Sequence, residues 1–238
     1  MVITLSRQAQ SGGDKIAELV AGEARMRLAD RGLLEQMAQR SGLPLAHMEI
    51  FDEMVPGPIE ALLAEWQTSV SQVVYLRRLV HTLLVLERED NVIIIGRGAA
   101  FVLTNPGTLH VRVVAPMPCR IARLIEGQGV TRGTAERILR KNDEERARFI
   151  RQAFGAEIDN PVHYDMVVNT AELPFEEAAG IVLRAAQRKS AQRQTVPVSP
   201  EDIMARVQRL RHRPHEPRVS EGVWEYCQRR QRSDPRNR

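Results

Sequence analysis

Residues 1–16 of this chain, MVITLSRQAQSGGDKI, have the layout of a phosphate-binding loop. A short apolar run is followed by a loop of small residues and then by the start of an amphipathic helix. In this order of strand, loop and helix, the N–H groups of the loop and the positive end of the helix converge on an anion. The segment therefore predicts a phosphate cradle built from backbone donors.

The side chains that complete such a loop in the Walker A pattern, G-x-x-x-x-G-K-[ST], are missing. That pattern supplies a lysine for the outer phosphates and a hydroxyl for Mg²⁺. Laid over this loop, it puts Arg7 on the first glycine and Gly12 on the second. Gly13 then falls on the lysine and Asp14 on the hydroxyl. Lys15 and Arg7 are the neighbouring cations that could substitute for the lysine.

A second candidate site follows the apolar segment 92–95, where Gly96, Arg97 and Gly98 stand in a row. If the segment is a strand, this turn lies at the carboxyl end, where open α/β sheets bind ligands. An arginine there can bind a phosphate or a base, and a glycine beside it lets a ligand approach the backbone. A tight turn with a solvent-exposed arginine would have the same pattern.

Two predicted helices carry closely spaced charges. Arg120 and Arg123 lie three apart within 116–126, and residues 141–148 with Arg151 form a dense charged stretch. Guanidinium groups bind phosphate oxygens through planar bidentate contacts and stabilise the charge that develops in phosphoryl transfer. A solvated helix face with i,i+3 and i,i+4 ion pairs would look alike. Both interpretations stay open at this point.

Asp30 precedes the predicted helix 32–40 and is well placed as its N-cap. It is equally suited to accept a hydrogen bond from a base or a ribose, or to contact a distant metal ion. Tyr164 and Asp165, before an apolar segment, are predicted to be structural. The six histidines show no spacing typical of a catalytic triad or of a metal site, so no metal ligands are predicted.

These residues require a scaffold that brings several loops together. Four short β-branched segments are predicted to be buried parallel strands: 2–5, 92–95, 110–114 and 166–168. Helices are predicted at 32–40, 59–89, 116–125, 131–153 and 174–188. Short strands separated by helix-length segments are typical of a parallel sheet covered by helices.

The composition is that of one α/β domain with an appendage. The longest apolar stretches are too short to span a bilayer, and the first residues do not resemble a signal segment. Cys119 and Cys227 are the two cysteines, and they lack metal-like spacing. These features predict a reduced, cytoplasmic protein that does not contact a membrane.

Charge divides the chain near residue 187. Residues 1–187 carry a net charge of −3, whereas residues 188–238 carry +7 and hold five of the thirteen prolines. We therefore predict a domain over 1–187 and a loosely packed, partly disordered extension over 188–238. Arginine-rich segments can bind nucleic acid phosphates, but aromatic residues for base stacking are few (Trp224 and Tyr226). A solubilising tail is the favoured interpretation.

With these residues in place, the chain resembles the cytidylate kinase-like family, relatives of bacterial cytidylate kinases. The resemblance is carried in order by ITLSRQAQSGGDKIAEL, LADRGLLEQMAQRSGL, NVIIIGRGAAFVL, LHVRVVAPMPCRIARL, KNDEERARFIRQAFG and YDMVVNTAEL. It covers most of residues 1–187 and ends before the basic extension. It implies a three-layer P-loop NTPase fold of the nucleoside monophosphate kinase type, with helical monophosphate-binding and lid regions.

The resemblance also implies roles for individual residues. The phosphates of the donor nucleotide are assigned to Ser11, Gly12, Gly13 and Asp14. The acceptor is assigned to Asp30, Arg97, Arg123 and Asp143. The catalytic cations it implies are Arg97, Arg120, Arg146 and Arg148, of which the last three belong to the lid region. Lys15 is added to them as the neighbouring cation that could substitute for the Walker lysine.

The chain departs from the pattern of true cytidylate kinases at several positions. Gly13 replaces the Walker lysine, which the resemblance implies is lacking in this subfamily as a whole. Asp14 replaces the Ser or Thr that holds Mg²⁺, and Gly98 replaces the acid of a G-R-D motif. Gln10 stands where relatives usually carry a loop glycine. Loss of the lysine removes a principal stabiliser of transition-state charge.

The resemblance implies a nucleotide kinase that uses ATP and Mg²⁺ to phosphorylate a pyrimidine nucleoside monophosphate such as CMP. The missing lysine, hydroxyl and acid support a second hypothesis, a nucleotide-binding regulatory protein without catalysis whose basic tail contacts a partner. The sequence leaves the acceptor and the oligomeric state open.

Overall fold

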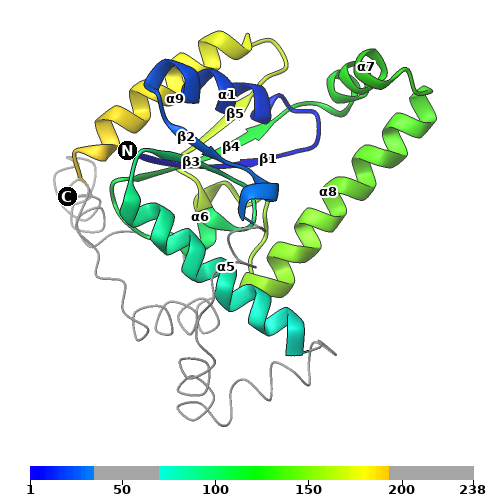
Figure 1. Cartoon of the computed structure of the whole chain (residues 1–238). Helices are drawn as coiled ribbons and strands as arrows, with labels where there is room; N and C mark the ends of the chain where they lie inside the picture. Colours follow the sequence, from blue (N-terminus) through cyan, green and yellow to red (C-terminus); the bar gives the residue numbers. More distant parts are fainter. Residues whose placement is uncertain (35–69, 193–238) are drawn as a thin grey trace, which may run out of the picture.

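The computed structural model describes residues 1–34 and 70–192. Within them a five-stranded parallel sheet has the order β2-β3-β1-β4-β5 (Figure 1). The strands are β1 (Val2–Arg7), β2 (Arg27–Ala29), β3 (Val92–Ile95), β4 (Thr108–Val114) and β5 (Met166–Asn169). The four predicted strands are confirmed. β2 was not predicted, because it has only three residues and begins with an exposed arginine.

Strand β1 lies at the centre of the sheet and fixes the position of its neighbours. Its Leu5 is in register with Ile95 of β3 and with Val111 of β4. Beyond the last paired residues, the Gly96 N–H donates to the Leu5 carbonyl at 3.0 Å. The loops that follow β1 and β3 therefore begin side by side at the carboxyl edge of the sheet.

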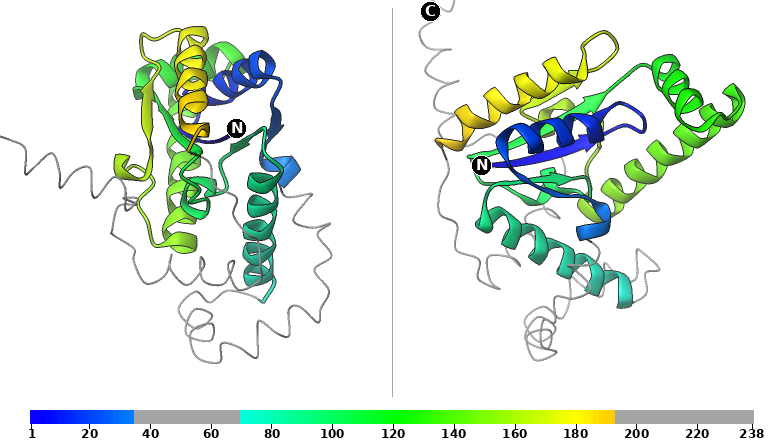
Figure 2. Two further views of the ribbon diagram at one scale, coloured as in Figure 1. Left: turned by 90° about the vertical axis from the view of Figure 1, so that its left-hand side faces the viewer. Right: turned by 45° about the horizontal axis from the view of Figure 1, so that its top comes forward.

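Helices cover both faces of the sheet, as Figures 1 and 2 show. On one face, α1 (Gly13–Ala24) and α9 (Phe175–Ser190) pack on Ile3 and its neighbours. On the other, α5 (Val70–Glu89) and α6 (Ala99–Val102) pack on Val2 and its neighbours. Alternate residues of β1 thus belong to different cores, as expected of a strand buried on both faces. The predicted three-layer α/β fold is confirmed.

Two further helices extend from the sheet as a hairpin, at the place where a lid region was predicted (Figure 1). They are α7 (Met117–Gln128) and α8 (Arg132–Phe154). Thr131 caps α8, since its side chain accepts a hydrogen bond from the Thr134 N–H. Ile121, Leu124 and Leu139 form a small core between the two helices. This core orients α8 toward the carboxyl edge of the sheet.

The remaining predicted elements agree only in part with these bounds. Helix α9 runs to Ser190 and so passes the domain boundary predicted at 187. The predicted helix 32–40 and the first half of 59–89 lie largely outside the described residues. In the described part of the chain, no helix combines the length and apolar character needed to cross a bilayer.

The two-sided core predicts the effect of truncating a central side chain. Ile3 is 0% exposed, so Ile3→Ala leaves a cavity and lowers the free energy of unfolding by about 2–5 kcal/mol, as measured by denaturant titration. Ile181→Ala is the matched control, because Ile181 lies on α9 and is 37% exposed. Its expected change is within about 0.5 kcal/mol. Equal losses in both variants would contradict this assignment of the core.

Candidate functional site

A pocket of about 280 Å³ lies where β1 and β3 end. It is bounded by the ends of these strands, the start of α6 and the middle of α8. Its basic side chains are Arg7, Arg31, Arg97 and Arg146. Its large apolar side chains are Phe101, Phe149, Ile150 and Ile158. Among the described lining residues, Glu145 is the single carboxylate, so the pocket suits an anion that carries an apolar ring.

The predicted phosphate loop connects β1 to α1 beside this pocket. Gly12 is the N-cap of α1, with φ +83°, and a Cβ there would lie 2.2 Å from Cε1 of Phe175. Only glycine fits both conditions. Gly13 opens α1, whose first-turn N–H groups have no partners within the helix and suit an anion. Gln10 has φ +57°, the left-handed conformation that a loop glycine would adopt easily.

Ser11 and Asp14 of the loop have partners of their own. Ser11 is fully buried, and its hydroxyl lies within hydrogen-bond distance of the carbonyls of Gln8 (2.9 Å) and Val113 (3.1 Å). Asp14 accepts from Nε of Arg7 at 3.0 Å and pairs with its Nη2 at 2.9 Å. The Ser11 hydroxyl therefore holds the loop to β4, and the Asp14 carboxylate contacts a cation of the pocket.

Arg97 lies in the turn after β3 and lines the pocket. Its φ of +49° is unusual for a residue with a side chain, and its guanidinium stacks on Phe149 of α8 at 5.7 Å from the ring centre. The next residue, Gly98, has φ +71°, and a Cβ there would lie 2.1 Å from the ring of Phe154. The acid of the G-R-D motif is thus excluded here by packing against α8.

The charged stretch of α8 contributes one face to the site. Asn142, Glu145, Arg146 and Phe149 line the pocket at helical spacing. Asp143 points to the phosphate loop instead, and its Oδ1 accepts from the Ala9 N–H at 2.9 Å. It also pairs with Arg146 at 3.5 Å. This helix therefore connects the loop with the pocket.

The two arginines of α7 hold the phosphate loop rather than line the pocket. Arg120 is buried, pairs with Asp143 at 2.5 Å and donates to the Ala9 carbonyl at 3.3 Å. Arg123 donates to the Gln10 carbonyl at 3.3 Å and to the Thr170 carbonyl at 2.6 Å. Both guanidinium groups have positioning contacts in this structure.

Three other predicted residues lie outside the pocket lining. Asp30 accepts from the Leu33 N–H at 2.8 Å, as the N-cap interpretation predicts. Lys15 is exposed and pairs with Glu18 at 3.6 Å. Arg148 is exposed and donates to Glu144 at 3.0 Å. Of the predicted catalytic cations, the structure brings Arg97 and Arg146 together in the pocket.

The arginines of the pocket interact electrostatically. Burial, together with the charges of Arg31 and Arg7, lowers the pKa of Arg97 to about 10. Burial and the charge of Arg7 also lower the pKa of Arg146, while Asp143 and Asp14 oppose that shift. A bound anion would relieve this repulsion and the cost of burial.

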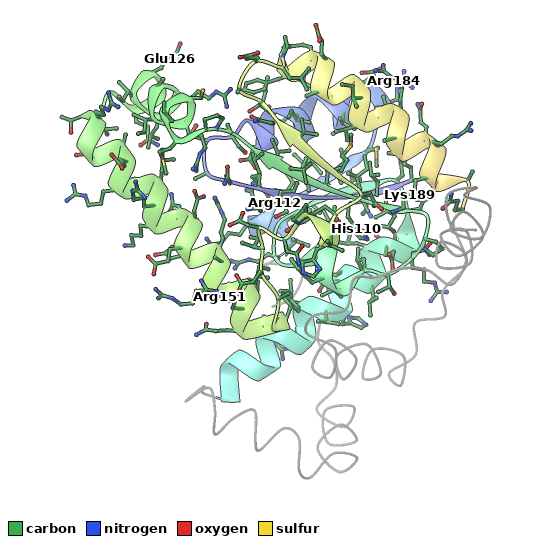
Figure 3. All side chains as sticks on the ribbon, turned by 180° about the vertical axis from the view of Figure 1, so that it is seen from behind. His110, Arg112, Glu126, Arg151, Arg184 and Lys189 are labelled. Carbon is green, nitrogen blue, oxygen red and sulfur yellow. The ribbon has the colours of Figure 1, made fainter. Side chains whose placement is uncertain are left out.

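Sequence reasoning missed Arg31 and Arg112. Arg31 lines the pocket one residue after Asp30, and its position depends on the unpredicted strand β2. Arg112 on β4, labelled in Figure 3, is buried and donates to Ser6 Oγ at 2.8 Å and to Asp159 at 2.5 Å. Arg112 lies within an otherwise apolar strand, so the hydrophobic pattern does not mark it as a candidate site residue.

Metal-binding clusters were not predicted from the sequence. Within residues 1–34 and 70–192, no three His, Cys, Asp or Glu side chains gather in a way that could hold a metal ion.

Comparison with known proteins places this chain in a family. The sequence matches the profile of the cytidylate kinase-like family over residues 2–172. The cytidylate kinase of Archaeoglobus fulgidus is 26% identical over 192 residues, which cover 79% of this chain and 96% of that protein. The cytidylate kinase of Pyrococcus horikoshii is 26% identical over 187 residues, with coverages of 78% and 88%.

A solved structure supports the fold. An uncharacterized protein from Eubacterium ventriosum superimposes with a TM-score of 0.61 at 17% identity, over 79% of this chain and 98% of that one. The family match spans most of the chain and contains the phosphate loop, the Gly96–Gly98 turn and both lid helices. The chain therefore belongs to the cytidylate kinase-like family of kinase-type phosphotransferases.

Proposed function

We propose that this protein transfers the γ-phosphoryl group of ATP to a pyrimidine nucleoside monophosphate such as CMP. One observation carries the proposal: four arginines and an apolar wall line a single pocket beside the phosphate loop. The names of the archaeal relatives, cytidylate kinases, support a pyrimidine acceptor.

The pocket suits the acceptor. Arg97, Arg146 and Arg31 form a basic lining that matches the phosphate of a nucleoside monophosphate. Phe149, which is only partly buried, offers aromatic surface on which a base can pack. A phosphate bound there would neutralise cations whose pKa values burial has lowered. Positioning and electrostatics of this kind supply most of the catalysis in phosphoryl transfer.

The phosphate loop suits the donor. N–H groups of the loop and of the first turn of α1 are the donors for its phosphates. We propose MgATP as the substrate, with the ion carried on the nucleotide, because Mg²⁺ commonly binds one or two carboxylates together with substrate phosphates. Asp14 supplies a carboxylate at that end of the loop.

A regulatory nucleotide-binding protein without catalysis is the second candidate. One observation favours it: Asp14, at the position where active kinases use a hydroxyl, pairs with Arg7, and the lysine position is taken by Gly13. Turnover separates the two functions. The purified protein is incubated with ATP, Mg²⁺ and each nucleoside mono- or diphosphate, and release of ADP is followed. Binding without turnover for every acceptor would support the regulatory protein.

Arg97 provides the sharpest test of the acceptor pocket. Arg97→Ala removes a charge-assisted contact of roughly 2–3 kcal/mol, so kcat/KM for the acceptor should fall by about two orders of magnitude. Donor affinity, measured by calorimetry, should change little, because the triphosphate binds at the other loop.

Arg140→Ala is the matched control, since Arg140 is exposed on α8 and pairs with Glu136. It should leave kcat/KM unchanged. Equal damage to donor and acceptor binding in Arg97→Ala would show that Arg97 is structural and contradict the acceptor site.

The missing acid at position 98 also has a testable cause. Gly98→Ala should lower the free energy of unfolding by about 1–3 kcal/mol, because its Cβ would meet the ring of Phe154 and its φ is positive. Gly127→Ala on α7 is the control, since a Cβ there meets nothing within 4 Å. It should leave stability unchanged or raise it. Full stability of Gly98→Ala in thermal melts would remove packing as the reason for this glycine.

A further inference from the structure

The first helical residue of the phosphate loop has no room for a side chain. A Cβ on Gly13 would lie 2.7 Å from Cβ of Arg7, 3.1 Å from its Cγ and 3.1 Å from Cδ2 of Leu5. Its backbone conformation does not itself require glycine, since positive φ values in this loop occur at Gln10 and Gly12. The stem of Arg7 is therefore what excludes a side chain at position 13.

Arg7 extends from this contact into the pocket. Its side chain is 17% exposed and lines the pocket beside the turn after β3. A Cβ on Gly96 would lie 2.9 Å from Nη1 of Arg7. The guanidinium thus lies between the start of α1, where the donor phosphates are proposed to bind, and Gly96, next to the arginine proposed for the acceptor.

We propose that Arg7 is the cation that contacts the phosphoryl group in transit, in place of the lysine that is absent at position 13. The Walker A pattern has glycine at the position of Arg7 and lysine at the position of Gly13. In this chain the cation is at position 7 and the glycine at position 13. The space beside the first residue of α1 has room for only one of the two side chains. This inference rests on the proposed function and deepens it.

The charge of Arg7 reaches both sides of the pocket. It contributes to lowering the pKa of Arg97 and of Arg146, which come from β3's turn and from α8. Because the Arg7 guanidinium acts on both Arg97 and Arg146, it is positioned to contact a phosphate bound between these two arginines. Arginine also offers a planar fork of donors, which suits several phosphate oxygens at once.

Asp14 holds the guanidinium without burying it. The carboxylate is 64% exposed and belongs to the first turn of α1. A carboxylate this exposed contributes little free energy to the pair. Phosphate oxygens that arrive at the loop can therefore replace Asp14 as the partner of Arg7.

A charge-removing variant tests the role directly. Arg7→Met keeps most of the stem that packs on Gly13 and removes the guanidinium. We expect kcat to fall by about 10²–10³-fold, with a melting temperature close to that of the wild type and a KM for the acceptor changed by less than fivefold. Arg140→Met is the control and should leave kcat unchanged. A kcat within threefold of the wild type in Arg7→Met would overturn the proposal.

Restoring the usual order of residues tests the exchange itself. Gly13→Lys alone should destabilise the protein, because the new side chain meets the stem of Arg7. Arg7→Gly alone should lose activity as Arg7→Met does. The double variant Arg7→Gly with Gly13→Lys should fold and regain at least tenfold of the kcat lost in Arg7→Gly. A folded double variant no more active than Arg7→Gly would overturn the exchange of positions.

Binding separates this inference from the proposed function. If the wild type transfers phosphate to no acceptor, the proposed function fails, and the role of Arg7 is judged from ATP affinity by calorimetry. A loss of at least tenfold in Arg7→Met, absent in Arg140→Met, would still support Arg7 as the phosphate-binding cation. Unchanged ATP affinity in that case would overturn it.

Discussion

The hydrogen bond from the Gly96 N–H to the Leu5 carbonyl continues the pairing of β1 and β3 past the last residues in register. It fixes the start of both loops at one edge of the sheet. Arg7 and Arg97 each stand two residues beyond the paired Leu5 and Ile95. The two guanidinium groups therefore reach the same pocket by backbone geometry, before any ligand contributes. The loop after β1, proposed to bind the donor, and the turn after β3, proposed to bind the acceptor, are placed together for the same reason.

Gathering cations at this edge disfavours folding, and the acids around it offset part of that effect. Asp143 is the most connected of them, because it accepts from the Ala9 N–H and pairs with both Arg120 and Arg146. It thus ties the phosphate loop, α7 and α8 together. A movement of the lid helices would change the loop and the pocket at once, since the same carboxylate contacts both. The repulsion that remains among the arginines is the part that a bound phosphate can relieve.

Much of the fold could be predicted from the sequence, whereas the site could be predicted only in part. Buried parallel strands are continuous apolar runs, and helices α7 to α9 have clear periodicity, so these elements were confirmed. β2 is too short to show a pattern, and without it Arg31 could not be placed. The charged stretch of α8 did not reveal which of its residues face the pocket, because that depends on how the α7–α8 core orients the helix. Arg120 and Arg148 carry the same charge, yet one is buried against Asp143 and the other is exposed.

Two of the glycines that replace kinase motif residues each face a side chain from another element. Gly98 faces the ring of Phe154, 56 positions later in the chain, and Gly13 faces the stem of Arg7. In both cases a side chain from another element fills the space that the motif residue would use. At position 98 the acid is lost without replacement, since the aromatic ring that fills its space cannot supply its charge. Position 13 differs, because the residue that fills its space is itself a cation directed into the pocket. If Arg7 acts as proposed, the missing lysine at position 13 is not evidence against catalysis, because the side chain that fills its space carries the same charge.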